Sequence, residues 1–343
     1  MPIAKLRVAV LMGGRSSEHE VSVSSARSVL GALDSERYEV ATVEIDREGR
    51  WALPRGREQD ELPAAPAETL PVPTDRRPPE PFSAVDVVLP VLHGPFGEDG
   101  TVQGLLELAG VPYVGAGVAA SALCMDKDLF KAVLRDRGVP VAANVTLRLG
   151  DPVRNPFDYP VFVKPARMGS SVGISKVRSA EELEAAVRLA RRHDEKVLIE
   201  EFVAGREVEC GVLGNVDSPP MASVVGEIVP RSADWYDYGA KYDEGGSDIV
   251  IPAPIPDETA ARVQTLAVES FVATECEGMA RIDFFLREDG EPVVNEINTI
   301  PGFTATSVYA QLFEASGIPY AALLDRLIEL ALERHERRSQ LVY

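Results

Sequence analysis

Residues 281–286 read Arg-Ile-Asp-Phe-Phe-Leu, and residues 292–298 read Pro-Val-Val-Asn-Glu-Ile-Asn. Each run has the pattern of a short β-strand, and the charged, glycine-ended turn 287–290 between them predicts a hairpin. Side chains two residues apart in a strand share a face. The polar side chains expected on one face of this hairpin are Arg281, Asp283, Glu296 and Asn298. Hard oxygen ligands of this kind suit Mg²⁺, which fills its octahedron with water and phosphate oxygens. A salt-bridged exposed face is the plain alternative.

Composition sets the class of protein. The chain has 343 residues, 45% hydrophobic and 26% charged, as expected of a soluble globular protein with two or three units. Its net charge of −19 argues against a general nucleic-acid binder, which needs basic surface. Three cysteines, Cys124, Cys210 and Cys276, lack metal-ligand spacing and are predicted to be reduced core residues. With no apolar run of membrane-spanning length, we expect a cytoplasmic protein that binds neither membrane nor nucleic acid.

Strand and helix patterns divide the chain into three predicted units. The first alternates strands and helices, which favours a parallel sheet, and the other two mix strand pairs with helices. The fold class is therefore α/β and α+β multidomain. The expected ranges are an N-terminal α/β domain over 1–115, a central domain over 116–203 and a C-terminal domain over 204–343. Segment 53–83 holds eight prolines and is predicted to be an irregular surface excursion of the first unit.

A glycine-serine turn follows the strand that ends near Lys164. Residues 164–173 read Lys-Pro-Ala-Arg-Met-Gly-Ser-Ser-Val-Gly, so small residues can wrap backbone N–H groups around an anion while Lys164 supplies charge. The pattern is not the Walker loop, which opens a helix with Gly-Lys-Ser/Thr. A purely structural hairpin turn is the alternative. Lys127, near the start of a predicted helix, is a second candidate phosphate ligand, and a solvated helix residue is its plain interpretation.

Segment 231–250 is long, poor in strand pattern and rich in tyrosine, with glycine hinges and Lys241. Such a segment is typical of a lid that excludes water from a reactive intermediate. A docked surface loop is the alternative.

Two motifs near the N-terminus follow predicted strands. Gly13-Gly14 suggests a dinucleotide site only weakly, because the third glycine is missing. Ser17 and Glu20 have capping-box spacing, which leaves Glu18 free to hold an ammonium group. A second predicted capping box joins Ser179 to Glu182. His93 opens the glycine-rich turn 93–100, and a lone histidine there is more often structural than catalytic.

Together these motifs resemble the D-alanine–D-alanine ligase family of the ATP-grasp superfamily. They occur in the family's order, run from residue 13 to residue 308 and cover nearly the whole chain. The motifs are 13–22, 93–100, 125–127, 164–173, 236–242, 281–283 and 295–304. The resemblance implies an ATP-grasp fold with an N-terminal parallel-sheet domain and ATP between the central and C-terminal domains. It also implies two Mg²⁺ (or Mn²⁺) ions on Asp283, Glu296 and Asn298, and a homodimer.

The resemblance assigns further residues to the nucleotide and the substrates. Those implied for ATP are Lys127, Lys164, Ser170, Ser171, Glu200, Glu201, Phe202, Val203, Glu207 and Lys241. Those implied for D-alanine are Glu18, His93, Lys241, Arg281, Gly302 and Ser307. Those implied to be catalytic are Glu18, Ser170, Lys241, Tyr242, Arg281 and Gly302.

The implied reaction is formation of an acyl phosphate on the first D-alanine, followed by attack of the second amine. Glu18 holds the first ammonium, and Ser170 and Tyr242 bond with Glu18. Ser307 and Lys241 receive the second carboxylate, while Arg281 and the Gly302 N–H stabilise the oxyanion.

Three alternatives remain. The chain could be a D-alanine–D-lactate or D-alanine–D-serine ligase, and Tyr242 argues against lactate as the acceptor. It could be another ATP-grasp carboxylate–amine ligase, against which the Glu18 segment and the Tyr242 loop argue. It could be a non-catalytic nucleotide-binding or scaffold protein, but no metal ligand or phosphate lysine is missing. Among the positions that depart from the family pattern, Val308 stands where leucine often follows the serine. The resemblance implies that Val308 lies beside the pocket for the second substrate, and how tightly that pocket fits its substrate is left open.

Overall fold

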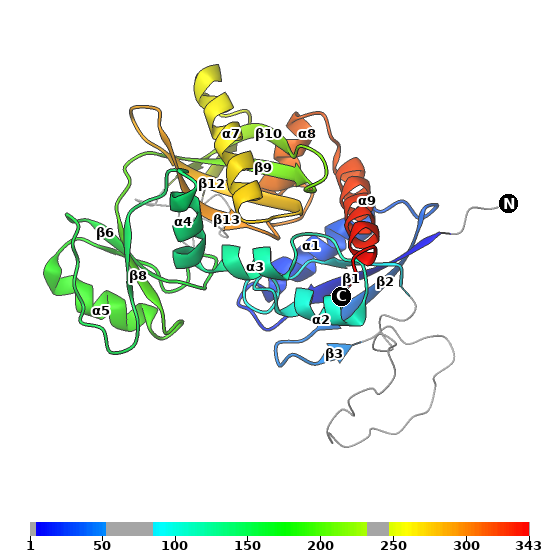
Figure 1. Ribbon diagram of the computed structural model, residues 1–343, viewed down its shortest axis with the longest axis horizontal. Helices are drawn as coiled ribbons and strands as arrows, with labels where there is room; N and C mark the ends of the chain where they lie inside the picture. The colour runs from blue at the N-terminus through cyan, green and yellow to red at the C-terminus, as the bar shows by residue number, and fades with distance from the viewer. Residues whose placement is uncertain (1–4, 53–84, 232–246, 343) are drawn as a thin grey trace, which may run out of the picture.

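The computed structural model describes residues 5–52, 85–231 and 247–342. Within these ranges the strands form three sheets, each with its own helices (Figure 1). The proline-rich excursion lies outside the described residues, as does most of the predicted lid. The last residues of the predicted lid, Ser247–Val250, form strand β11, which pairs antiparallel with residues 227–230. The prediction of a strand-poor loop through residue 250 is therefore wrong at this end.

The N-terminal sheet has the strand order β3-β2-β1-β4. Strand β1 (Leu6–Gly13) pairs in parallel with β2 (Tyr38–Ile45) and β4 (Val87–Pro90), which confirms the predicted parallel sheet. The short edge strand β3 (Trp51–Ala52) runs antiparallel to β2. Helix α1 (His19–Ala32) packs on β1, and α2 (Thr101–Ala109) packs on the opposite face. With both faces covered, β1 is continuously apolar from Val8 to Met12 rather than alternating.

The central sheet has the order β5-β8-β6-β7 and is antiparallel throughout. Its strands are β5 (Asn144–Leu147), β6 (Val161–Pro165), β7 (Ser175–Val177) and β8 (Val197–Glu201). Helix α5 (Ala180–Ala190) packs on β6 and β7, and their apolar side chains form a separate core. Strand β7 begins only at Ser175, because residues 170–173 form the turn.

The C-terminal sheet is antiparallel with the order β11-β10-β9-β12-β13. Its long strands are β9 (Arg206–Gly214), β10 (Met221–Pro230), β12 (Gly278–Leu286) and β13 (Pro292–Asn298). Helix α7 (Asp257–Ala273) and helix α8 (Val308–Ala315) cover opposite faces. Val212 and Ala280 share a core with α7, whereas their neighbours Leu213 and Met279 share one with α8. Helix α8 covers this second face only at one end of the sheet. Further along β12 the same face carries Arg281 and Asp283.

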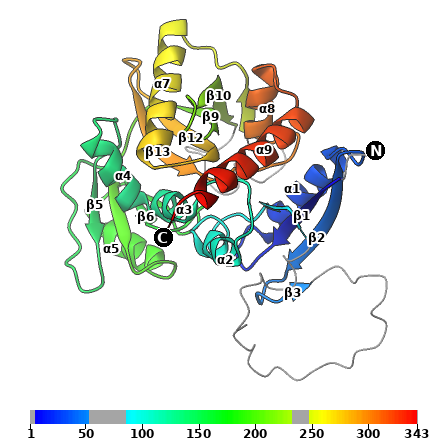
Figure 2. The same cartoon turned by 45° about the vertical axis from the view of Figure 1, so that its right-hand side comes forward.

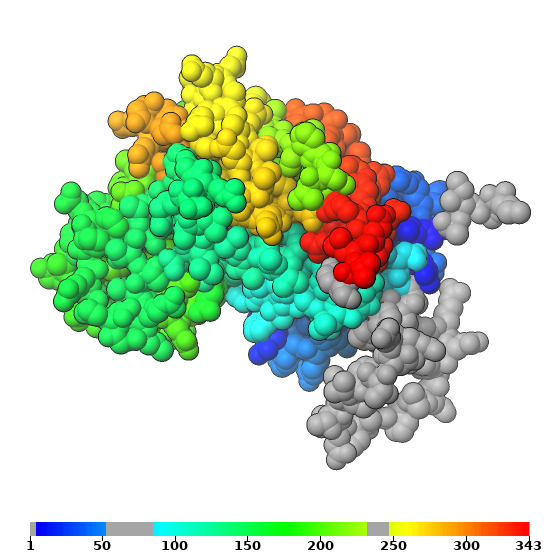
Figure 3. Space-filling model, in the orientation of Figure 1, coloured from blue at the N-terminus to red at the C-terminus, as the bar shows by residue number. Residues whose placement is uncertain are grey.

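Two connections cross between the predicted units. Helix α9 (Tyr320–Ser339) packs its leucines against the core of the N-terminal sheet, and its red surface in Figure 3 meets the cyan and blue surface of the N-terminal segment. Helices α3 (Val118–Met125) and α4 (Lys127–Asp136) add Cys124, Phe130 and Leu134 to the core of the C-terminal sheet. Figure 2 shows α3 near the middle of the molecule and α4 between the central and C-terminal sheets. The domain boundaries at residues 116 and 204 remain predictions.

Both predicted capping boxes differ from the structure. Helix α1 begins at His19 with Glu18 as its N-cap, and no side-chain cap bond forms. Glu20 instead pairs with Arg47 at 2.9 Å on the surface. At α5 the Ser179 side chain makes no cap bond, while Glu182 accepts the backbone N–H of Arg178 at 2.8 Å. Spacing alone did not place the first helical residue correctly at α1.

Candidate active site

The predicted hairpin exists, and its register sets the two carboxylates directly opposite one another. Asp283 lies across from Glu296, and Arg281 lies across from Asn298. The alternate residues Ile282 and Phe284 are fully buried beneath the sheet, as the sequence predicts. The register then shifts, because Phe284 pairs with Val294 and leaves Asn295 as an extra residue. This β-bulge turns Asn295 toward the same side as Glu296. The alternation rule cannot foresee the bulge, so sequence reasoning missed Asn295.

A cavity of about 370 Å³ lies between the central and C-terminal sheets. The predicted site residues that line it are Lys127, Lys164, Ser171, Phe202, Val203, Glu207, Asp283 and Glu296. Phe202 and Val203 form an apolar wall beside these charged groups. The backbone after β8 and the face of the hairpin therefore meet around one space, although about 80 residues separate them.

Both predicted phosphate lysines are buried at this cavity. Lys127 Nζ lies 2.9 Å from Glu296 Oε1 and donates to the Met168 carbonyl at 2.8 Å. Lys164 Nζ lies 2.6 Å from Glu200 Oε1 and 3.4 Å from Asn295 Oδ1. The side chains of Lys127 and Lys164 are only 7% and 6% exposed, so neither is a solvated surface residue. Two ammonium groups converge here on a partly enclosed space, which suits an anion with several charges.

Glu200 has a different setting from the one expected of a ligand residue. Its carboxylate is 1% exposed and is shared between Lys164 and the fully buried Lys131. Burial would raise the pKa of Glu200, but the two ammonium groups lower it to about 2. Burial lowers the pKa of Lys131 to about 8, against the opposing effect of Glu200. The neighbouring Glu201 accepts the Ala143 N–H at 2.9 Å and pairs with Arg287 at 3.7 Å.

Lys131 was missed by sequence reasoning, although it lies four residues after Lys127 on α4. Replacing Lys131 by methionine should reduce the free energy of unfolding by about 3–5 kcal/mol, because it removes one partner from a buried ion network. Denaturant unfolding measures this. As a control, Arg188→Met removes an exposed pair with Glu184 and should change stability by less than about 1 kcal/mol. Equal, small effects in both variants would show that the folded protein does not need Lys131 to compensate the buried charge of Glu200.

The glycine-serine turn brings the central domain to the N-terminal segment. Ser170 and Ser171 both adopt left-handed backbone conformations, with φ of 50° and 57°. Non-glycine residues rarely adopt these, and strain of this kind clusters at functional sites. Ser170 Oγ donates to Glu18 Oε1. The predicted contact between these two residues is therefore present. A Cβ on Gly94 would lie 2.7 Å from Glu18 Oε2, so this glycine leaves room for the carboxylate.

The turn at 93–100 joins the N-terminal sheet to the segment after β13. His93 is buried, with Nδ1 2.9 Å from the Ile300 carbonyl and Nε2 3.3 Å from Ser25 Oγ. Burial lowers the pKa of His93. Glu98 accepts the N–H groups of Gly94 at 2.6 Å and Ile300 at 3.1 Å. Both side chains thus hold the Ile300 backbone. Glu98, like Asn295, was absent from the sequence-predicted set.

Burial and the nearby Glu18 carboxylate raise the pKa of Glu98 to about 8. An unfolded glutamate titrates near about 4.3, so between these values the folded protein retains a proton that the unfolded chain has released. The contribution of Glu98 to stability should therefore fall as pH rises from about 5 to 8. Glu98→Gln cannot titrate and should flatten this slope, whereas Glu36→Gln at the surface should leave it unchanged. Thermal unfolding across that pH range measures both variants, and an unaltered slope in Glu98→Gln would contradict the assignment.

Arg281 lies among carboxylates on the open face of the sheet. Its Nε is 2.7 Å from Asp283 Oδ1 and 3.0 Å from Glu209 Oε2. Gly302 follows in the segment after β13, where an added Cβ would meet Ser307 Oγ at 3.4 Å. Ser307 is the N-cap residue of α8 and accepts the Thr304 N–H at 3.0 Å. Hence Gly302 and Ser307 lie together. Lys241 and Tyr242 lie outside the described residues.

The donor set of the hairpin fits a hard divalent cation. Across residues 5–52, 85–231 and 247–342, no group of three His, Cys, Asp or Glu side chains forms a self-sufficient metal site. The hairpin offers two carboxylates, Asp283 and Glu296, and the amide of Asn298, whose Nδ2 donates to Asp283 Oδ2 at 2.9 Å. Mg²⁺ ordinarily uses one or two protein carboxylates and takes its other ligands from water and phosphate. The set is therefore suited to a cation that arrives with a polyphosphate.

Comparison with known proteins gives consistent matches over most of the chain. The family described as "D-ala D-ala ligase N-terminus" matches residues 7–116, and "D-ala D-ala ligase C-terminus" matches residues 133–329. A D-alanine–D-alanine ligase of Solibacter usitatus is 50% identical over 342 residues, covering 98% of each chain.

Two solved structures have the same fold. The D-alanine–D-alanine ligase of Coxiella burnetii superposes with a TM-score of 0.84 at 37% identity, covering 98% of this chain and 96% of that one. The D-alanine–D-alanine ligase of Bacillus anthracis, complexed with ATP, gives a TM-score of 0.77 at 27% identity, covering 97% and 99%. The fold prediction of an ATP-grasp protein is confirmed.

Proposed function

The chain belongs to the D-alanine–D-alanine ligase family, and we propose that the residues of its cleft join two D-alanines in an ATP-dependent reaction. The product is D-alanyl-D-alanine, a precursor of peptidoglycan. The observation that carries this proposal is the single cavity lined by Lys127, Lys164, Asp283 and Glu296. It combines cations for a polyphosphate with carboxylates for its metal.

The nucleotide half of the cleft lies between the central and C-terminal sheets. Phe202 and Val203 offer an apolar wall for the base, and Glu207 lines the same cavity. The ammonium groups of Lys127 and Lys164 face the phosphates and neutralise the charge that shifts when the γ-phosphoryl group moves. The turn with Ser170 and Ser171 provides further donors. When bound at Asp283, Glu296 and Asn298, two Mg²⁺ ions would draw charge from the phosphoryl oxygens.

The amino-acid half lies between Glu18 and Arg281. Glu18, oriented by Ser170, holds the ammonium of the first D-alanine and so directs its carboxylate toward the γ-phosphate. The second amine then attacks the acyl phosphate, which gives a tetrahedral oxyanion. Arg281 and the Gly302 N–H stabilise that oxyanion, and Ser307 receives the second carboxylate. In this proposal His93 positions the segment at Ile300 rather than touching substrate.

Phosphate release tests the proposal. With ATP and Mg²⁺, D-alanine should stimulate release far more than L-alanine, because a single arrangement of Glu18 and Arg281 fits one enantiomer. Equal release with both enantiomers would contradict a site built for D-alanine. The same assay with D-lactate or D-serine added as acceptor checks the alternatives, and we expect D-alanine to give the highest rate.

Glu18→Gln removes a charge-assisted contact to the first ammonium, worth roughly 1.5–3 kcal/mol. Because about 1.4 kcal/mol corresponds to a tenfold change, the apparent affinity for the first D-alanine should weaken at least about tenfold. ATP affinity should scarcely change. Steady-state kinetics with each substrate varied measures both quantities. If ATP binding weakened while D-alanine saturation stayed intact, the N-terminal segment would serve the nucleotide instead.

Two further properties are proposed with the function. Among the described residues, no helix is both long and apolar enough to cross a membrane. We place the protein in the cytoplasm, where ATP is supplied. We also propose a homodimer, which sedimentation of the purified protein would test.

A further inference from the structure

Two buried thiols that the ligation reaction does not use lie against each other. Cys124 Sγ and Cys276 Sγ are 3.7 Å apart, although 152 residues separate them in the chain. Cys124 lies in the last turn of α3, and Cys276 lies just before β12. A disulfide bond is about 2.05 Å long, so the two sulfur atoms need to approach by about 1.7 Å to form one. Only a small local adjustment therefore separates this pair from a disulfide.

One of the two thiols borders a cavity. Cys276 lines a cavity of about 330 Å³ beside the 215–220 segment and the end of α7. Cys124 does not line this cavity. Cys276 is 1% and Cys124 3% exposed, so the route proposed for a small oxidant is through this cavity to Cys276.

The surroundings of the two thiols shift their pKa values in opposite directions. The Cys124 thiol lowers the pKa of Cys276, against the effect of burial, and Thr274 Oγ1 at 3.4 Å adds to this lowering. The same bond raises the pKa of Cys124. Thiolates rather than thiols are nucleophiles, so Cys276, which lines the cavity and has the lowered pKa, is the residue that reacts first.

We propose that Cys124 and Cys276 form an oxidisable dithiol site, which hydrogen peroxide converts into a disulfide linking α3 to the start of β12. The Cys276 thiolate attacks one peroxide oxygen, which breaks the O–O bond, gives a sulfenic acid and releases hydroxide. Cys124 then attacks the Cys276 sulfur, its proton combines with the departing hydroxide, and water leaves. Two thiols are oxidised by two electrons, and one peroxide is reduced to two waters.

The disulfide also acts on the cleft, a consequence that rests on the proposed function. Cys124 lies two residues before Asp126, the N-cap of α4, and three residues before Lys127. Asp126 Oδ1 accepts the N–H groups of Asp128 and Leu129, each at 3.2 Å, so the junction of α3 and α4 is a rigid corner. Pulling Cys124 toward Cys276 displaces Lys127, whose Nζ is 2.9 Å from Glu296. A misplacement of about 1 Å can cost about a hundredfold in rate. We expect turnover to fall at least about tenfold on oxidation.

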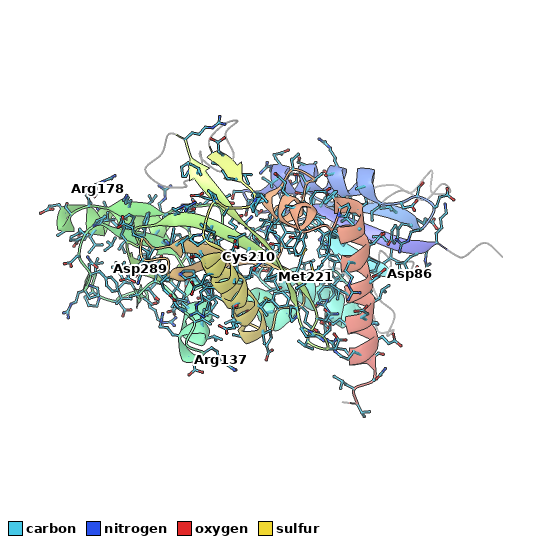
Figure 4. All side chains as sticks on the ribbon, turned by 90° about the horizontal axis from the view of Figure 1, so that it is seen from above. Asp86, Arg137, Arg178, Cys210, Met221 and Asp289 are labelled. Atoms are coloured by element: carbon cyan, nitrogen blue, oxygen red, sulfur yellow. The ribbon has the colours of Figure 1, made fainter. Side chains whose placement is uncertain are left out.

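The experiment treats the full-length protein with hydrogen peroxide, removes the oxidant and blocks the remaining thiols. Non-reducing peptide mapping should find a Cys124–Cys276 linked pair, and the intact mass should fall by two hydrogens. Dithiothreitol should restore both mass and turnover. Cys210 is the matched control, because it is equally buried in the C-terminal sheet (Figure 4) but contacts Ser223 rather than a thiol. Cys210→Ala should oxidise as the parent does, whereas Cys276→Ala should form no link and keep its turnover in peroxide.

The site would be overturned if the parent protein gave no Cys124–Cys276 linked peptide. It would also be overturned if linked peptides that contain Cys210 formed to the same extent. A linked peptide with unchanged turnover would overturn its coupling to Lys127. The mass measurement does not depend on ligation, so failure of the proposed function leaves the test of the dithiol intact. Far-ultraviolet circular dichroism of the oxidised protein, expected to match the reduced form, distinguishes a disulfide from unfolding.

Discussion

Turnover of Glu296→Gln should fall at least about a hundredfold, the order expected for losing one strong electrostatic contact in the transition state. Glu296 faces Asp283 across the hairpin and lies 2.9 Å from Lys127. The amide keeps the size of the side chain and can still accept a hydrogen bond from the lysine. It cannot supply the negative charge that a divalent cation requires. Steady-state phosphate release at saturating ATP and D-alanine measures the effect.

A control on the same hairpin separates the metal site from general damage. Glu288→Gln changes an exposed carboxylate in the turn between β12 and β13 and should leave turnover within about twofold of the parent. Raising Mg²⁺ should recover part of the lost rate in Glu296→Gln only. Near-normal turnover of Glu296→Gln at ordinary Mg²⁺ would mean that the hairpin is not the metal site.

Arg281→Met should lower kcat by about a hundredfold to a thousandfold, the range found when one oxyanion donor is removed. Arg281 projects from the open face of β12 between Glu209 and Asp283. The positive charge of Arg281 stabilises the reaction mainly when the tetrahedral oxyanion forms, so the KM for ATP should change little. Kinetics with each substrate varied distinguishes the two parameters.

Two further variants make this result interpretable. Arg281→Lys retains the charge and should recover part of the rate, since a lysine cannot reproduce the two-pronged contact. Arg262→Met removes an exposed arginine that pairs with Glu291 at 3.6 Å, and it should have no kinetic effect. If Arg281→Met kept its kcat while the KM for ATP rose, Arg281 would be a nucleotide contact rather than an oxyanion donor.

The sequence predicted best what depends on local pattern. The strand patterns of residues 281–286 and 292–298 predicted the hairpin, and the alternation of strands and helices in the first unit predicted its parallel sheet. The turn around Ser170 was recognisable because its small residues follow a strand that ends in lysine. The pattern over residues 164–173 was therefore enough to predict this turn without knowledge of any tertiary contact.

What the sequence could not predict depends on tertiary context. The bulge at Asn295 is set by pairing between strands rather than by the composition of either strand. Lys131 resembles any helical lysine until the fold buries it against Glu200. Glu98 becomes distinctive only when the chain brings Ile300 to its carboxylate across 202 residues. The start of α1 was also misplaced, since its N-cap is Glu18 without the expected side-chain bond, whereas Ser179 is the N-cap of α5 as predicted.

The most direct test of the account follows oxygen from D-alanine into phosphate. The protein is supplied with ATP, Mg²⁺ and D-alanine whose carboxylate carries oxygen-18, and the released phosphate is analysed by mass spectrometry. If the carboxylate attacks the γ-phosphorus and the second amine displaces phosphate, one labelled oxygen passes from each activated D-alanine to the phosphate. The other stays in the peptide carbonyl of the dipeptide. Phosphate free of label, formed alongside dipeptide, would contradict activation through an acyl phosphate in this cleft.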